Sequence, residues 1–360
     1  MTTINDFAIL KKDMTSTSFS LDIGEKYIKI GQVIKKGNLI ETTALAYEES
    51  GYNIYLTEAD KPHQSTLQVI SQLMNDSGIK KKSINIIIPD GRSYSRIIEM
   101  PLLTDRELSS AIKYQADQFI PIPIDKVNLD VEVLLTDKKN KKSLILLVAA
   151  ASSVVDKVVN IAESVGLLPE RIENESSGTF KLLSYLNPIF KSKTAKTGSL
   201  FLIMNFGFSS TSLYIYDATR DLPLDIHNFA IGYELMAKSI KNNYNISDSE
   251  VKNLIETIGL GSQSGTYDLS QVLASAYSEL VSEIEKFIVS AKSKFGLPIS
   301  EINYFGEGFK LKDLHQKLSG SLGIKTELID IYGNLSKNNV SDFFKADLPL
   351  FVPILGSEII

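Results

Sequence analysis

The sequence predicts an α/β protein built from two similar halves, with a small α/β insertion inside the first half. Its 360 residues suit two domains of ordinary size. Three strands with a tight turn, followed by a helix and a further strand, are expected from residue 19 and again from residue 200. Between the two groups, residues 92–151 switch to a strand, a helix and two more strands, which indicates an inserted subdomain.

The first half opens with short apolar or alternating segments that are separated by turn residues. The strands expected from this pattern are residues 19–23, 27–34, 39–47 and 83–90. A helix is expected over residues 65–77, because apolar side chains recur there at helical spacing and Gly78 follows as a stop signal. Residues 1–18 are polar and aperiodic, so we expect a loosely held tail.

The insertion carries a helix start signal and a basic turn. Thr104 and Glu107 form a capping box, in which a hydroxyl and a carboxylate satisfy free backbone amides at the start of a helix. This helix is expected to run to about Phe119, and strands over 127–136 and 144–151 follow it, joined by a lysine-rich turn. We interpret these lysines as a solvated hairpin tip.

After the insertion the first half resumes with a helix and a strand. The helix is expected over 152–165, and the short strand after it contains Glu173 and Glu175 and leads into another helix. Residues 187–199 are polar and contain proline and glycine, so we expect them to be the linker between the halves.

The second half repeats the pattern of the first. Its expected strands are residues 200–205, 211–216 and 223–229. Its expected helices are residues 233–242, a helix that begins at the capping box Ser247–Glu250, and residues 269–295. Gly306 and Gly308 separate a strand from a helix, and 326–332 is the last expected strand. The apolar segment 348–360 is broken by prolines, and we expect it to pack into the second lobe.

Composition and charge argue against several classes of function. Hydrophobic residues make up 43% of the chain and charged residues 22%, which is ordinary globular usage and allows a sizeable core. The net charge of −5 argues against nucleic-acid binding. Cysteine is absent, which excludes disulfides and thiolate metal sites, and the three histidines show no ligand spacing. Since we find no signal peptide and no membrane-length apolar run, we expect a cytoplasmic protein that reaches a membrane only through a partner.

Two turns carry residue types suited to binding phosphate. In the first half Asp22 ends a strand and Gly24 follows, and in the second half Asn205 and Gly207 take the same places. A glycine lets the backbone approach an anion, turn amides and hydroxyls then contact phosphate oxygens, and an aspartate can hold Mg²⁺ or its waters. One such turn is commonplace, but two at equivalent places predict a clamp for a nucleoside triphosphate.

Several motifs resemble those of the actin-like ATPases, and within them the PilM family of type IV pilus assembly proteins. They are LDIG (21–24), NFGFSST (205–211), YFGEG (304–308) and the inserted segment 96–134. The resemblance covers nearly the whole chain from about Phe19, and it implies a two-lobed actin-like fold with ribonuclease H-like duplicated halves and a βαββ inserted subdomain. The expected parts are 19–91 with 152–187 (first lobe), 92–151 (insertion) and 199–360 (second lobe).

The resemblance also implies a function. It implies ATP and Mg²⁺ in the cleft between the lobes, with Asp22 as the metal ligand. It implies binding of the cytoplasmic tail of a PilN-like inner-membrane protein, further pilus-assembly proteins as partners, and a homo-oligomeric ring or platform. The nucleotide-binding residues that it implies are Asp22, Gly24, Lys29, Asn205, Gly207, Ser209, Ser210, Thr211, Gly232, Gly306, Glu307 and Gly308.

The implied nucleotide site departs from the family pattern in four places. The first turn has Glu25–Tyr27 where small hydroxyl residues are usual, so negative charge and bulk approach the phosphate position. Asn205 removes a carboxylate from the second turn, Gly232 is followed by Tyr233 instead of a glycine, and GEG replaces a run of three glycines. These departures favour loss of ATP hydrolysis and leave ATP binding open, whereas the insertion follows the family pattern.

Our first hypothesis is therefore a PilM-like scaffold of a pilus, secretion or competence apparatus. One alternative is an active ATPase or small-molecule kinase of the same fold, with Asp22, Glu173 and Glu175 as candidate catalytic carboxylates. We favour a structural role for the last two, in a polar joint between lobes. The other alternative is an FtsA-like filament-forming protein, although the end of the chain lacks the basic face of a membrane-binding helix.

Overall fold

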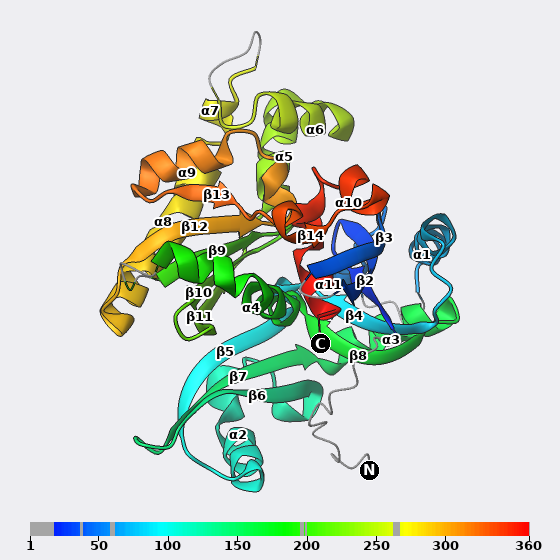
Figure 1. Ribbon diagram of the computed structural model, residues 1–360. Coiled ribbons are helices and arrows are strands. Elements are labelled where there is room, and N and C mark those ends of the chain that lie inside the picture. Colours follow the sequence, from blue (N-terminus) through cyan, green and yellow to red (C-terminus); the bar gives the residue numbers. More distant parts are fainter. Residues whose placement is uncertain are drawn as a thin grey trace.

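The computed structural model describes residues 18–36, 39–57, 62–194, 198, 200–261 and 267–359. The tail expected over 1–18 therefore lies outside the described residues, except for Ser18. The described chain forms three β-sheets with helices packed around them (Figure 1). Within these ranges, no helix combines the length and apolar character needed to cross a membrane.

The first sheet has six strands in the order β14-β3-β2-β1-β4-β8. These strands are β1 (Phe19–Ile23), β2 (Tyr27–Lys36), β3 (Leu39–Glu49), β4 (Ser83–Ile88), β8 (Leu168–Asn174) and β14 (Leu335–Ser336). Helices α1 (Gln64–Ser77) and α3 (Ser152–Ser164) pack against one face, where Ile70 and Ile161 share an apolar cluster with Ile84. Burial of β4 within the sheet explains its continuously apolar sequence.

The second sheet has five strands in the order β11-β10-β9-β12-β13. These strands are β9 (Leu200–Phe206), β10 (Thr211–Asp217), β11 (Leu222–Phe229), β12 (Ile299–Phe305) and β13 (Thr326–Leu328). The helices around it are α5 (Tyr233–Tyr244), α6 (Asp248–Thr257), α7 (Leu269–Val272), α8 (Ala274–Phe295) and α9 (Leu314–Leu322). Leu280 and Ile284 form the core-facing stripe of α8 and share a cluster with Leu202.

The two sheets repeat one arrangement, as the sequence predicts. β9 is antiparallel to β10 and parallel to β12, just as β1 is antiparallel to β2 and parallel to β4. We call the six-stranded sheet with its helices the first lobe, and the five-stranded sheet with its helices the second lobe. Two expected elements differ in length: the strand expected over 326–332 ends at Leu328, and the helix expected over 269–295 is divided at Leu273.

The insertion forms a separate antiparallel sheet in the order β5-β7-β6. Its elements are β5 (Ser93–Pro101), α2 (Asp105–Phe119), β6 (Val127–Asp137) and β7 (Lys142–Ala151), which confirms the predicted βαββ order. The predicted capping box is present, because Thr104 N donates to Glu107 Oε2 over 2.9 Å and Glu107 N donates to Thr104 Oγ1 over 3.4 Å. Figure 1 shows α2 on the outer side of this sheet, away from both lobes.

Helix α4 (Glu175–Thr194) contradicts the expected linker. The expectation of a linker over 187–199 is wrong for residues 187–194, which continue the helix through Pro188. Leu182, Leu186 and Phe190 are buried in a cluster to which both lobes contribute, so packing outweighs the helix-breaking effect of proline. Of the remaining linker residues only Gly198 is described.

The C-terminal segment packs against both lobes, so the expectation that it packs into the second lobe holds only in part: Leu350 and Phe351 share a cluster with Phe201 and Phe305 of the second lobe, but the segment also completes the first lobe. It contains β14, which pairs with β3, and helices α10 (Asn339–Phe343) and α11 (Val352–Ser357). Helix α11 packs against α4, and Glu358 accepts hydrogen bonds from Ser20 Oγ (2.7 Å) and Asn85 Nδ2 (3.2 Å) of the first sheet. The expected boundaries of the lobes remain a proposal, and the C-terminal segment belongs structurally to both.

Candidate functional site

An ion-paired cluster at the hairpin of β1 and β2 lies where the two lobes meet. Asp22 and Lys29 face each other across this hairpin, with Lys29 Nζ 2.8 Å from Asp22 Oδ2. Lys29 Nζ also lies 3.6 Å from Glu307 Oε1, which belongs to the second lobe. Asp22 is 0% exposed and Lys29 is 2% exposed. The structure thus brings three of the predicted nucleotide-site residues together, already paired with one another.

Burial and mutual attraction set the protonation of this cluster. Burial raises the pKa of Asp22, and the ammonium group of Lys29 opposes that effect only in part. Burial lowers the pKa of Lys29, but the carboxylates of Asp22, Glu307 and Glu175 outweigh it, so its pKa lies above the ordinary value. Lys29 is therefore charged at neutral pH and supplies the positive charge of the cluster.

The residues do not fit the Mg²⁺ site that the resemblance implies. Asp22 Oδ1 is buried and accepts no hydrogen bond from any described residue, so one oxygen is open to a cation. However, the Lys29 ammonium group already lies against Asp22 and Glu307. In the described part of the chain no group of three or more His, Cys, Asp or Glu residues is placed to hold a metal ion, whereas Mg²⁺ requires several oxygen ligands. The predicted metal role of Asp22 gains no support here.

In the hairpin of β9 and β10, the side chains of the predicted site residues Asn205 and Thr211 form hydrogen bonds with other residues of the same chain. Asn205 Nδ2 donates to Glu175 Oε2 over 3.1 Å. Thr211 Oγ1 donates to the carbonyl oxygen of Ile231 over 2.6 Å and is fully buried. Both side chains thus have structural partners inside the protein.

The N-terminus of α5, which follows Gly232, is used by this same hairpin. The backbone amides of Tyr233 and Glu234 donate to the carbonyl oxygens of Gly207 and Phe208 over 3.0 and 2.8 Å. A Cβ atom on Gly232 would lie 2.3 Å from the carbonyl oxygen of Phe208, so the close approach requires glycine. These two helix amides, which could otherwise bind an anion, are satisfied within the protein.

The turn after β12 packs directly against the second hairpin. Gly306 has a φ angle of 88°, and a Cβ atom there would lie 2.4 Å from Asn205 Oδ1. A Cβ atom on Gly308 would lie 2.0 Å from the ring of Phe206. Glu307, between the two glycines, is the buried carboxylate that pairs with the first hairpin. The expected adenosine motif therefore lies next to both hairpins, and its glycines are explained by packing.

A lysine and several aromatic rings fill the region beside this turn. Lys310 Nζ lies 5.3 Å from the ring centroid of Tyr27, 5.6 Å from that of Tyr47 and 5.8 Å from that of Phe309. Burial lowers the pKa of Lys310 below its ordinary value. The bulky Tyr27 of the first turn is thus buried and packs against Lys310.

The two candidate catalytic carboxylates at the start of α4 lie in different surroundings. Glu175 Oε2 accepts hydrogen bonds from Asn205 Nδ2 (3.1 Å) and Asp90 N (3.0 Å) in the cleft. Burial, and after it the charge of Asp90, raises the pKa of Glu175 well above its ordinary value. Glu173 instead pairs with Lys181 over 2.7 Å and lines a groove beside the insertion. The structure places Glu175 in the cleft and Glu173 outside it.

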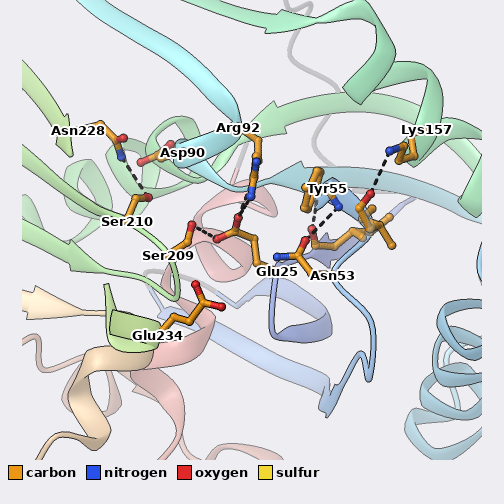
Figure 2. Close-up of polar contacts among 12 residues, drawn as sticks. Glu25, Asn53, Tyr55, Asp90, Arg92, Lys157, Ser209, Ser210, Asn228 and Glu234 are labelled. Atoms are coloured by element: carbon orange, nitrogen blue, oxygen red, sulfur yellow. Dashed lines mark hydrogen bonds and ion pairs between the residues drawn. The ribbon is translucent and has the colours of Figure 1, made fainter. Parts of the chain in front are cut away.

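Glu25 links the turns of the two hairpins (Figure 2). Arg92 Nε donates to Glu25 Oε1 over 2.8 Å, and Ser209 Oγ donates to Glu25 Oε2. Ser210, the other predicted serine, is instead 3.4 Å from Asn228 Nδ2. Glu25, like Lys29, therefore connects the first lobe to the second.

Sequence reasoning missed Asp90, Arg92 and Tyr214. Tyr214 Oη of the second lobe donates to Asp90 Oδ2, and Ser176 N donates to Asp90 Oδ1 over 2.9 Å. The available signal was the polar sequence DGR directly after a continuously apolar strand, because strand ends in α/β sheets often carry site residues. Nothing in the sequence pointed to Tyr214, which lies within an apolar strand.

A groove of about 440 Å³ lies between the insertion and the first lobe. Its walls come from β6, β7, α3 and β8. β6 and β8 are edge strands, and no described strand pairs with their outer sides. The lining is apolar at Ile88, Val148, Ala150, Val155 and Val159, and charged at Asp130, Glu163, Glu170, Arg171 and Glu173. The sequence analysis did not find this groove, because its walls come from segments far apart in the chain.

Comparison with known proteins agrees with this architecture. The family model described as "Type IV pilus assembly protein PilM" matches residues 20–350. A solved PilM-PilN type IV pilus biogenesis complex contains a chain that is 19% identical, with a TM-score of 0.79, over 96% of this chain and 99% of that one. MreB 5 of Spiroplasma citri bound to AMPPNP is 12% identical, with a TM-score of 0.47, over 95% of this chain and 94% of that one. The expected actin-like ATPase fold is confirmed, and the chain belongs to the family of the type IV pilus assembly protein PilM.

Proposed function

We propose that this protein is a scaffold of type IV pilus assembly that binds the cytoplasmic tail of a PilN-like inner-membrane protein. The observation that carries the proposal is the groove between the insertion and the first lobe, which two edge strands border. The similarity to a chain of the PilM-PilN complex supports the choice of partner. In this proposal the protein is cytoplasmic and lies at the inner membrane only through that partner.

The groove suits an extended peptide. Its floor is apolar and includes Val148 and Val159, so alternate side chains of a peptide can be buried there. The outer sides of β6 and β8 offer backbone amide and carbonyl groups that can pair with an added strand. A short tail that is disordered when free can therefore gain affinity from main-chain hydrogen bonds and specificity from the floor.

The charges around the groove set the expected chemistry of the tail. Four carboxylates, those of Asp130, Glu163, Glu170 and Glu173, line it with one guanidinium group, that of Arg171. A peptide with apolar residues and at least one basic residue is therefore favoured, and binding should weaken as salt rises. We propose that other pilus-assembly proteins, and further copies of this chain, bind elsewhere on the surface.

Binding of the tail peptide tests this proposal. The probe is a fluorescent synthetic peptide with the sequence of the cytoplasmic tail of the PilN-like protein from the same organism. Val159→Arg fills the apolar part of the groove with a long side chain and adds a positive charge that repels a basic peptide, and we expect it to weaken binding by at least about tenfold, which corresponds to about 1.4 kcal/mol. Val289→Arg is the matched control, because Val289 is 68% exposed on α8 in the second lobe.

Two results would contradict the proposal. One is that the wild-type protein fails to bind the tail at all. The other is that Val159→Arg and Val289→Arg bind the tail equally well, which would place the peptide outside the groove.

A further inference from the structure

We propose that Glu25 occupies an anion site between the two hairpins and thereby holds the lobes together without a nucleotide. The carboxylate takes the place that a phosphate group would need, so the cleft is closed by a residue of the chain itself. This inference concerns the cleft and goes beyond the binding of a partner tail in the groove.

The contacts of Glu25 are those of a bound anion. Its side chain is 4% exposed, although it projects from a turn. Oε1 accepts hydrogen bonds from Arg92 Nε (2.8 Å) and from Arg92 Nη2, and Oε2 accepts one from Ser209 Oγ. A bidentate guanidinium group and a hydroxyl group are the donors with which proteins commonly hold phosphate.

The guanidinium group of Arg92 is itself held in position. It lies 5.4 Å from the ring centroid of Tyr55, as a cation–π contact requires. Tyr55 Oη in turn donates to the carbonyl oxygen of Ile23 over 2.6 Å, at the end of β1 (Figure 2 shows Tyr55 beside Arg92). Tyr55 and the end of β1 therefore hold Arg92 in position, and among the described contacts of Glu25 the second lobe contributes the hydroxyl group of Ser209.

The donors that hold Glu25 are the ones that a phosphate group would need, and the two lobes lie close together beside them. The backbone of Gly91 approaches the second hairpin so closely that a Cβ atom there would lie 2.7 Å from Ser210 Oγ. A phosphate group would compete with Glu25 for Arg92 and Ser209. It would also add negative charge near the carboxylates of Asp22 and Glu307, which Lys29 already pairs with. Bringing like charges together in this way costs several kcal/mol.

Titration calorimetry with Mg-ATP and with Mg-tripolyphosphate tests the occupancy of this site. We expect Glu25→Ala to bind each ligand at least about tenfold more tightly than wild type, because it frees Arg92 and Ser209 and removes a negative charge. Glu279→Ala is the matched control, since it removes the same charge from an exposed position on α8, and it should bind like wild type. Glu25→Gln keeps the size of the side chain and serves if Glu25→Ala does not fold. Equal binding by wild type and both Glu25 variants would overturn the proposal.

Spin-label distances between the lobes test the closure. The chain has no cysteine, so Gln68→Cys in α1 and Lys252→Cys in α6 can be labelled without background. Without nucleotide we expect a narrow distance distribution in the labelled parent, and a broader or longer one after Glu25→Ala or Ser209→Ala. Ser210→Ala should leave the distribution unchanged, because the Ser210 hydroxyl does not contact Glu25. A Glu25→Ala distribution identical to that of the parent would overturn the role of Glu25 in closure.

Discussion

The contact between α4 and α11 gives the sharpest prediction about stability. A Cβ atom on Gly356 would lie 1.7 Å from the carbonyl oxygen of Gly178 and 2.6 Å from its carbonyl carbon. Cβ atoms in proteins essentially never lie closer than 3.0 Å to such atoms, so Gly356→Ala must push the two helices apart by more than 1 Å or bend their backbone. Neither backbone can rotate out of the way as a flexible side chain could.

The expected cost follows from overpacking. Overfilled sites typically lose about 1–3 kcal/mol, and here the neighbouring atoms are backbone, so we expect a value at the upper end of that range. In a chain of this length that corresponds to a fall of roughly 3–4 °C in melting temperature. Hydrogen exchange should also accelerate in α11, because the displaced helix loses its packing against α4.

Gly320→Ala is the matched control, with the same chemical change and the opposite expected sign. Gly320 lies within α9 and is exposed, and a Cβ atom there meets nothing within 4 Å. Alanine in such a helical position is about 0.5–1 kcal/mol more favourable than glycine, so we expect a small rise in melting temperature. The packing argument fails if Gly356→Ala is as stable as wild type, or if both substitutions lower stability equally.

Two further predictions concern the buried charges. Burial raises the folded-state pKa of Glu175, so the folded protein keeps a proton that the unfolded chain releases, and stability falls as pH rises through the raised value. Denaturation by urea should therefore show Glu175→Gln gaining stability relative to wild type as the pH rises above the ordinary pKa of a glutamate, and a difference that does not change with pH would refute this. Lys29→Met leaves the carboxylate of Asp22 buried without its partner, and we expect a loss of about 3–5 kcal/mol in the same assay. Adding Asp22→Asn should restore most of that loss, and a double variant as unstable as Lys29→Met would contradict the pairing.

Local patterns in the sequence predict most of the fold. The strand over 19–23 and the capping boxes at Thr104 and Ser247 are found where the residues predict them, because each depends on neighbours within a few positions. The linker prediction failed at Pro188, since burial of the surrounding helix between the lobes cannot be seen locally. The place of the C-terminal segment depends on contacts between residues more than 300 positions apart in the sequence, so local patterns could not predict it either.

The sequence predicted several residues of the candidate site, but it did not predict which residues they contact. Asp22 and Lys29 were expected at a phosphate position and Glu307 in the adenosine motif, and in the structure Lys29 pairs with both carboxylates. Glu25 was recognised only as a departure from the family pattern. Its partners Arg92 and Ser209 lie 67 and 184 residues away, and no local spacing relates residues so far apart.

The position of the C-terminal segment has a consequence for the order in which the protein can fold during synthesis. The first lobe lacks an edge strand and the acceptor for Ser20 and Asn85 until residues 335–358 are available. These residues are translated after the whole second lobe, so the N-terminal lobe cannot complete its core before the C-terminal lobe has emerged from the ribosome. A chain that ends at residue 330 would therefore contain all five strands of the second sheet but only five of the six strands of the first, and the side of α4 that packs against α11 would be exposed for a chaperone to bind.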